Sequence, residues 1–209
     1  MVTQFVAAFD DIVINRYNRS RDVVDKINVR YLYAPKSRVL NDLTNKAQHI
    51  KIPAVSVSIG SVERDEQRVF NKIVGFYDAM PSIGTTDFLP SPVPVNIGIN
   101  MSVITKYQTD MDQILSNFIP YSNPYIIISW KVPADLSNRT TEIRSEVEWS
   151  GSISIDYPTE LDSQTTARVT ADTSFVIKGW LFPYNASLSA SNIFTVTTNF
   201  TPLTGFDYV

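Results

Sequence analysis

The sequence contains no cysteine among its 209 residues, only one histidine and only 7 glycines. Without cysteine there can be no disulfide framework, no thiolate zinc site and no thiol nucleophile. A Ser-His-Asp triad would depend on His49, which has no Gly-x-Ser-x-Gly turn beside it, so we interpret His49 as a surface or strand-edge histidine. Glycine-rich phosphate-binding loops are also absent from the sequence. We therefore predict no cofactor.

Long hydrophobic runs and a strong charge of one sign are missing too. No apolar run approaches the length of a membrane-spanning helix, and the N-terminal segment lacks the basic start of a signal peptide. The composition is 44% hydrophobic and 19% charged, which is typical of a globular protein. The formal charge of −3 disfavours a broad basic surface for nucleic acid. We predict a globular protein without a membrane partner.

The first third of the chain changes between helical and strand periodicity. Phe5, Phe9 and Ile12 lie on one face of a helix predicted over residues 3–17. Residues 27–33 alternate as a strand. The other predicted elements are a short helix over 36–43 with Val39, Leu40 and Leu43 inward, a half-buried strand from His49 with Val55, Val57 and Ile59 on one face, and a solvated strand end or hairpin over 63–68. The mixed charges of 63–68 leave an oligomer contact open as an alternative.

Two segments lack clear regular structure. Residues 71–91 have weak periodicity and several glycines and prolines, which indicates a loop of about 20 residues. Loops of that length in a compact domain often bind partners, so we predict a partner contact there. Residues 190–209 are predicted to form a final strand or an extended arm. The sequence thus indicates one domain, 1–209, with an extended loop over 71–91 and a C-terminal arm over 190–209.

The second half of the chain predicts long strands. Every odd-numbered residue from Val93 to Val103 is apolar, the alternation of a half-buried strand. The alternating runs 143–157 and 169–181 are separated by turn residues, so we predict that they pair as an antiparallel hairpin. Trp180 is interpreted as an aromatic residue that closes the core, with a stacking platform for a ligand as the alternative. The overall pattern is a long-stranded sheet with two or three helices.

An Asp-x-Asp pair, Asp110 and Asp112, permits two interpretations. Thr109 and Asp112 have the form of a capping box, and acidic residues favour the first turn of a helix. The apolar residues that follow at helical spacing are Met111, Ile114, Leu115 and Phe118. A metal ion would need further ligands, which the linear sequence does not nominate. We favour the helix start and predict no metal ligand and no catalytic residue.

The same stretch predicts where this helix ends. Pro120 is expected to halt it, because proline lacks the amide hydrogen that a helix interior uses. Residues 125–132 are β-branched and aromatic, which predicts a buried strand.

Several of these segments resemble the tail sheath stabiliser family of contractile-tailed bacteriophages, whose members are also called tail completion or tail terminator proteins. The blocks 27–45, 49–72, 89–125 and 173–185 occur in the family's order. The residues that carry the signature are Pro92, Lys106, Tyr107, Asp110, Met111, Pro120, Tyr121, Pro124, Gly179, Trp180 and Pro183. The family pattern leads us to expect an apolar residue in place of Asp112, so it gives the Asp-x-Asp pair no support as a metal site.

The resemblance implies an α+β fold in which a mixed, mostly antiparallel sheet is flanked by two or three helices, as in tail terminators. It implies a non-enzymatic virion protein, assembled in the host cytoplasm, that forms a homo-hexameric ring in the neck region of the tail. The implied partners are the tail sheath protein, a tail tube terminator or tube protein, and a neck or head-completion protein. Viral DNA would pass through the channel without specific binding.

Two other classes of function remain open on the residues alone. A β-rich binding or adhesion module would present residues 71–91 or Trp180 to a saccharide or peptide. A metal-dependent enzyme would use Asp110 and Asp112 as ligands.

Overall fold

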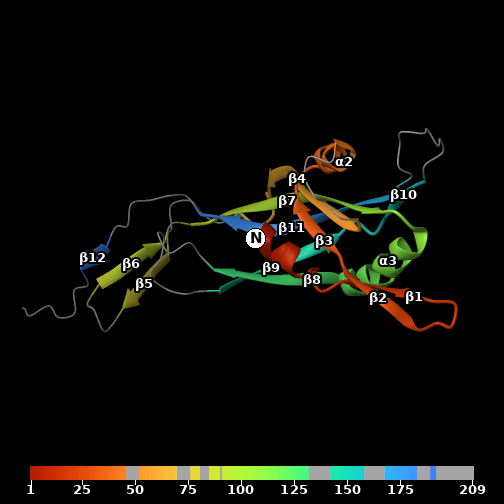
Figure 1. The fold of residues 1–209 in the computed structure, drawn as a ribbon. Coiled ribbons are helices and arrows are strands. Elements are labelled where there is room, and N and C mark those ends of the chain that lie inside the picture. The colour runs from red at the N-terminus through yellow and green to blue at the C-terminus, as the bar shows by residue number, and fades with distance from the viewer. Residues whose placement is uncertain are drawn as a thin grey trace, which may run out of the picture.

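A computed structural model describes residues 1–45, 52–69, 76–80, 85–89, 91–131, 142–157, 168–182 and 189–191. Its centre is a seven-stranded sheet (Figure 1). The strand order is β3 (Arg30–Tyr33), β4 (Ala54–Arg64), β7 (Val93–Thr105), β11 (Val169–Leu181), β9 (Glu142–Trp149) and β8 (Tyr125–Lys131), with β10 (Ser154–Asp156) also paired to β11. Only β3 and β4 pair in parallel within this sheet. The predicted α+β class with a mixed, mostly antiparallel sheet is confirmed.

The pair of β7 and β11 forms the middle of the sheet. The two strands are in antiparallel register over their full length, from Val93 opposite Leu181 to Thr105 opposite Val169. The odd-numbered residues of β7 from Val95 to Val103 are buried, as the alternation predicted. The predicted hairpin is confirmed as well, because both β9 and β10 pair with β11. The chain leaves strand conformation between β9 and β10, so one predicted run becomes two strands.

An aromatic cluster forms the core on one face of the sheet. Helices α1 (Val2–Ala7) and α3 (Gln108–Ser122) cover this face and bring Phe5 and Phe118 against Phe175 of β11. Phe9 lies between them, and the ring centroids within this group are 5.0–5.8 Å apart. Such edge and stacked contacts add to the stabilisation that burial of these large rings provides.

Helix α2 (Lys36–Asn45) covers part of the opposite face. Val39 is buried, and Leu40 and Leu43 are half-buried, so the predicted helix and its inward face are confirmed. The Lys36 ammonium donates to Asp172 Oδ2 at 2.7 Å and to Thr170 Oγ1 at 3.1 Å, which fastens the start of α2 to β11. The rest of this face is left open by α2, and we call it the open face.

The prediction of a helix over 3–17 was wrong beyond its first turns. α1 ends at Ala7, and β1 (Val13–Tyr17) pairs with β2 (Val23–Asn28) in a separate antiparallel sheet. Ile14 is buried opposite Ile27, so strand pairing takes the apolar residues that the helical pattern had used. β-Branched residues such as those near Ile14 favour strands over helices, which explains the outcome.

The strand predicted over 27–33 is divided between two sheets. β2 ends at Asn28 and β3 begins at Arg30. The residue between them, Val29, is buried and donates its backbone N–H to Ile12 O at 3.1 Å. The chain therefore passes at Val29, without an intervening loop, from pairing with β1 to pairing with β4.

Residues 71–91 are not the continuous loop that was predicted. β5 (Phe76–Met80) and β6 (Thr85–Leu89) pair antiparallel, and β12 (Ser189–Ser191) adds to β6. These strands of five and three residues are too short for alternation to identify them. β12 is the described start of the predicted C-terminal arm, and residues 192–209 lie outside the described part.

Helix α3 departs from its prediction at both ends. Its N-cap is Tyr107, which makes no side-chain cap hydrogen bond, so the predicted capping box at Thr109 was wrong. Pro120 lies inside the helix, which continues to Ser122. A proline this close to the C-terminus removes only a late backbone hydrogen bond, and Ser122 Oγ donates to Phe118 O at 2.9 Å in the same turn.

Two strands differ from their predicted burial. β8 was predicted to be buried but is an edge strand, with Ile126 and Ile128 inward and Tyr125 and Ile127 exposed. β4 was predicted to be half-buried, but its first residues are buried on both faces and its residues from Ile59 onward are exposed. No helix in the described ranges is long and apolar enough to cross a membrane.

Candidate functional site

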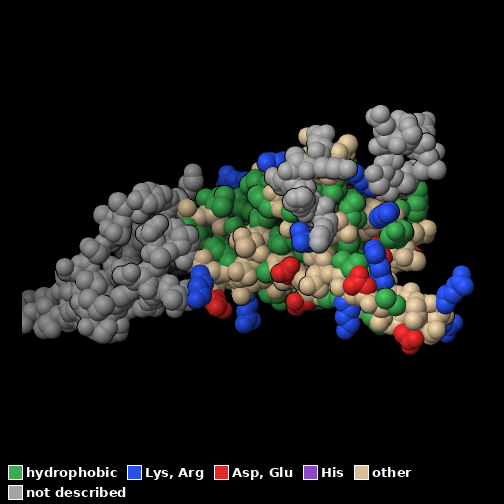
Figure 2. Space-filling view, viewed as in Figure 1, with side chains coloured by type: hydrophobic (Ala, Val, Ile, Leu, Met, Phe, Trp, Pro, Cys, Tyr) green, Lys and Arg blue, Asp and Glu red, His purple; other side chains and the backbone are tan. Residues whose placement is uncertain are grey.

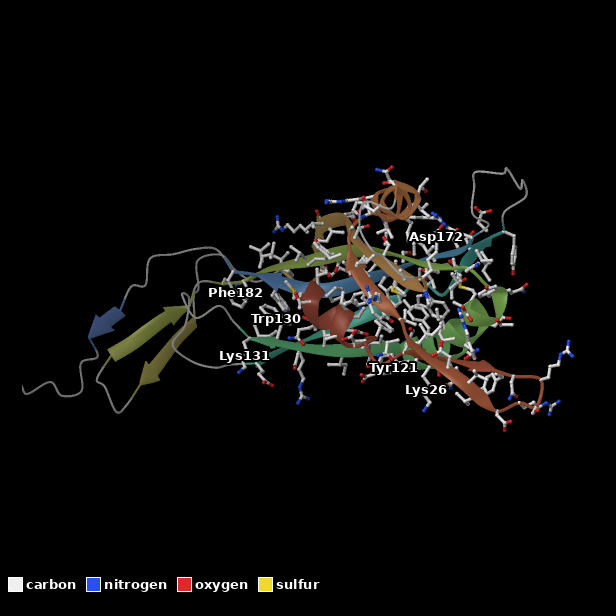
Figure 3. All side chains as sticks on the ribbon, in the orientation of Figure 1. Lys26, Tyr121, Trp130, Lys131, Asp172 and Phe182 are labelled. Atoms are coloured by element: carbon white, nitrogen blue, oxygen red, sulfur yellow. The ribbon has the colours of Figure 1, made fainter. Side chains whose placement is uncertain are left out.

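Most of the described signature residues lie near the two ends of the β7–β11 pair, whereas Pro120, Tyr121 and Pro124 lie at the end of α3 and before β8. Strands of 13 residues span about 40 Å, so the two groups are well separated. One group, which we call the helix junction, contains Lys106, Tyr107 and Asp110 where β7 passes into α3. The other, the Trp180 end, lies where β7 begins and β11 ends. In Figure 3, Trp130 and Phe182 lie toward the Trp180 end, and Tyr121 lies at the end of α3, between the two groups.

The helix junction is held by one arginine from β1. Asp110 is 2% exposed, and its Oδ2 lies 3.3 Å from Arg16 Nη2. The Arg16 guanidinium also lies 5.2 Å from the centroid of the Tyr107 ring, and the Lys106 ammonium lies at the same distance. An ion pair and cation–π contacts together attach the β1–β2 hairpin to the start of α3.

Gln113 makes the second attachment between β1 and α3. Its side-chain Nε2 donates to Asn15 O, and its Oε1 accepts from Asn15 N–H, both at 3.0 Å. The amide thus takes the place of a neighbouring strand for one residue of β1. Because an isolated two-stranded hairpin is only marginally stable in water, these contacts with α3 give the hairpin a fixed position.

The two aspartates of the Asp-x-Asp pair do not converge on one point. Asp110 is buried and paired with Arg16, whereas Asp112 is exposed. Residues two apart on a helix do not face each other, which accounts for the difference. Within the described ranges, no three His, Cys, Asp or Glu side chains gather in a way that could hold a metal ion. The geometry therefore contradicts a metal site built on this pair.

The remaining signature residues around α3 contribute to packing. Met111 is buried in the core, and the ring of the exposed Tyr121 makes a T-shaped contact with Phe9 at 5.6 Å between ring centroids. Pro120 and Pro124 are exposed at the end of α3 and before β8. This part of the signature shapes the passage from helix to edge strand.

At the Trp180 end, a second arginine organises the contacts. Arg68 Nε donates to Asp65 Oδ2 at 2.6 Å, and Arg68 Nη2 donates to Val95 O at 3.2 Å and Asn96 Oδ1 at 2.9 Å. Its guanidinium lies 5.1 Å from the centroid of the Trp180 ring. The charged run 63–68 is therefore a structured end of β4 that is attached to β7 and β11. Trp180 joins this attachment from the face of β11 opposite Phe175, and it is not part of the core cluster of the described residues, so both interpretations of Trp180 stay predictions.

The other residues of this end are placed as follows. Gly179 lies opposite Val95, and a Cβ at this position would be 2.6 Å from Met1 Sδ. The end of a methionine side chain can move, so the glycine permits the close approach of Met1 without being strictly required. Pro92 is half-buried just before β7. Pro183 and His49 lie outside the described residues.

Arg68→Gln is expected to raise the pKa of Asp65. In the native protein the hydrogen bond from Arg68 holds the pKa of this carboxyl below its ordinary value. The contact with Asp65 therefore stabilises the fold above the unfolded-state pKa of this group, and the stabilisation is lost as the pH falls through the lowered pKa. Carboxyl carbon NMR titration of Asp65 checks the shift, with the exposed Asp112 as the internal control. An Asp65 pKa that is unchanged in Arg68→Gln would contradict the contact.

One hollow on the described surface is lined mainly by polar residues. It has a volume of about 550 Å3 and is lined by serines of several strands together with Lys36 and Asp172. The Lys36 ammonium is held by Asp172 Oδ2 and Thr170 Oγ1, so it is not placed as a base for a serine. This hollow does not assemble catalytic machinery.

Sequence reasoning missed the cations that hold these places together. Arg16, Lys36 and Arg68 each bond to side chains or carbonyls of another element, and for Arg16 and Lys36 the partner is 94–136 residues away in sequence. Isolated basic residues next to strands carry no linear pattern that would identify such contacts.

A family model described as T4-like virus Myoviridae tail sheath stabiliser matches residues 1–205. Among solved structures, one similar chain is the sheath/tube terminator, in the extended state, of the extracellular contractile injection system PVC, with a TM-score of 0.43 and 11% identity. The match covers 96% of this chain and 63% of that chain, so the protein spans less than two thirds of that terminator's length. No curated protein sequence matches the chain.

Proposed function

Because the chain belongs to the T4-like virus Myoviridae tail sheath stabiliser family, and is thus a structural component of a contractile phage tail, we propose that it forms a hexameric ring that terminates the sheath and tube. The observation that carries this proposal is the family match over residues 1–205 of the 209-residue chain. The ring would lie in the neck region of the virion and connect the tail to the head.

A ring is the assembly that suits a terminator. Head-to-tail contacts between identical subunits either propagate as a helix or close by rotation, and only a closed ring stops growth. The described signature residues support such a role, because they fix the hairpin, α3 and the end of β4 on the sheet through packing and ion pairs. A rigid frame lets six copies meet in one repeated geometry.

The proposed partners follow from this position. They are the tail sheath protein, the tube protein or a tube terminator, and a neck or head-completion protein, with assembly in the host cytoplasm. Six copies at −3 carry a formal charge of −18 (6 × −3), which repels passing DNA phosphates. Figure 2 shows Lys and Arg side chains interspersed with Asp and Glu on the visible face. Both features support passage of DNA without specific binding.

We propose that the protein acts without catalysis. The carboxylate that would begin a metal site, Asp110, is buried and already paired with the partly exposed Arg16. The lysine in the serine-lined hollow, Lys36, is likewise paired with Asp172. Charged groups that serve the fold in this way are not free to serve a reaction.

Negative-stain electron microscopy combined with mass measurement tests the ring. We expect sixfold rings of six times the 23.5 kDa chain mass, in solution or on the ends of sheathed tails. Sheath polymer capped by the protein should also resist disassembly longer than uncapped polymer. A strict monomer that does not associate with sheath or tube would contradict the proposal.

A further inference from the structure

The strand order of the central sheet ends at β3 and at β8 (Figure 1), and no strand lies beyond either of them among the described residues. β8 is the last strand on one side. On the other side β3 pairs only with Ala54–Val57, so Ser58–Arg64 of β4 has no strand beyond it among the described residues. One open edge is 125–131 in β8; the other is 58–64 in β4, which a β-bulge between Ile59 and Ser61 interrupts, so its regular part is 61–64.

Both edges expose large apolar side chains. Val62 is 54% exposed on the core face of β4, with Ile59 beside it, and Ile127 is 58% exposed on the open face of β8, with Tyr125 beside it. An exposed edge of this length offers unpaired backbone N–H and C=O groups to another strand. Neither edge contains a proline, which is one of the residues that block such pairing.

We infer that the Ser58–Arg64 edge of one copy pairs with β8 of the next copy, so that the sheets join around the ring. This inference rests on the proposed ring. It uses opposite edges of one sheet, which gives a head-to-tail contact that can close by rotation. A second copy of this chain is therefore the occupant of both edges.

The topology also sets the direction of the new pairing. From β4 to β8 the sheet passes through four antiparallel steps, β4–β7, β7–β11, β11–β9 and β9–β8, so β4 and β8 run in the same direction. Rotation about a ring axis that lies along the strands preserves that direction. The strands of neighbouring copies should therefore pair in parallel.

Charge favours the same arrangement. In parallel pairing, Lys131 at the end of β8 lies beside the end of β4, where Glu63 and Glu66 are exposed. The third acid there, Asp65, is already engaged by Arg68. The side chains also match by face, because Glu63 lies opposite Asn96 and Lys131 opposite Glu142, on the open face of the sheet. Antiparallel pairing would place Lys131 beside Ser58 instead.

Paired cysteine substitutions test both the contact and its direction. The chain has no cysteine of its own, so every disulfide must come from the introduced residues. Under mild oxidation, we expect the variant with Glu63→Cys and Ser129→Cys to form disulfide-linked oligomers of increasing size, up to a closed hexamer. Glu63→Cys with Tyr125→Cys is the matched control, because in parallel pairing these residues are separated by about four strand positions, roughly 13 Å.

The outcomes separate this inference from the proposed ring. Microscopy and mass measurement of the same samples, in solution or on tail ends, report whether rings are present. Three results with rings present would overturn the parallel edge pairing and leave the ring standing. They are crosslinking only in the pair with Tyr125→Cys, crosslinking in neither pair, and crosslinking to the sheath protein instead of a second copy. Absence of rings in every setting would overturn the proposed function itself.

A charged residue on the edge provides a second test without disulfides. Ile127→Lys is expected to raise the protein concentration needed for ring formation at least tenfold. The reason is that a lysine on an exposed edge discourages strand pairing. Its thermal unfolding as a monomer should be unchanged, since Ile127 is exposed. Val24→Lys on the exposed hairpin is the matched control and should assemble normally. Equal assembly of the two variants would overturn the inference.

Discussion

Phe118→Ala is expected to lower the free energy of unfolding by about 3–5 kcal/mol. Phe118 is 1% exposed, and its ring stacks on Phe9 at a centroid distance of 5.0 Å. It also makes T-shaped contacts with Phe175 of β11 at 5.5 Å and Trp149 of β9 at 6.4 Å, so it joins α3 to two strands. Alanine would remove the apolar contacts of a whole ring and leave a cavity beneath α3. The surrounding strands are paired on both sides, so they cannot collapse far into that space.

Urea unfolding followed by circular dichroism measures this loss. For a chain of this size each kcal/mol lowers Tm by about 2–4 °C, so the expected fall is roughly 6–20 °C. Ile119→Ala on the same helix turn is the control, because Ile119 is exposed and should change stability by less than about 1 kcal/mol. Phe118→Leu should lie between the two. If Phe118→Ala and Ile119→Ala unfolded at the same urea concentration, the aromatic cluster could not be the centre of the core.

The parts of the fold that the sequence predicted well are those with a long, regular period. The alternation from Val93 to Val103 identified β7, and Val39 with its neighbours identified α2. In both cases one face is buried and the other is polar, so period and burial agree. The pairing of residues 143–157 with 169–181 followed from alternation and an intervening turn.

The failures occurred where tertiary contacts outweigh a local pattern. Phe5, Phe9 and Ile12 have helical spacing, but β2 offers Ile14 a strand partner and the helix stops at Ala7. Pro120 is tolerated in α3 because it lies in the last turn. Short strands such as β5 and β6 have too few residues for a period to emerge.

The functional residues were predicted only in part. The resemblance identified Tyr107, Asp110 and Trp180, and the structure places them at two attachment points. It did not identify Arg16 or Arg68, whose side chains make the ion pairs and cation–π contacts at those two points. Their partners are defined by the fold, and a single sequence without a linear motif does not connect a residue in β1 with one in α3.

For the contact between Arg16 and Asp110, we expect that removing Arg16 alone costs more stability than removing both side chains. Arg16→Met should destabilise the protein by about 1–3 kcal/mol, because it leaves the Asp110 carboxylate buried without its cation. The value lies below that of a fully buried pair because the Arg16 side chain is 40% exposed to solvent, which screens its charge. Adding Asp110→Leu to Arg16→Met should restore part of the loss, since no unpaired charge then remains.

A double-mutant cycle with chemical denaturation measures the coupling, and amide hydrogen exchange of Val13–Tyr17 shows where it acts. We expect Arg16→Met to speed exchange in β1 more than in β7, because the ion pair holds the hairpin and the central strands are fixed by their own register. Asp112→Ala is the matched control on the same helix, since its carboxylate is exposed. A coupling of zero, or faster exchange spread evenly over the sheet, would show that Arg16 does not hold the hairpin in place. If the coupling is found, the β1–β2 hairpin is a positioned element of the subunit, and any contact that it makes in the tail is set in part by a single ion pair at the start of α3.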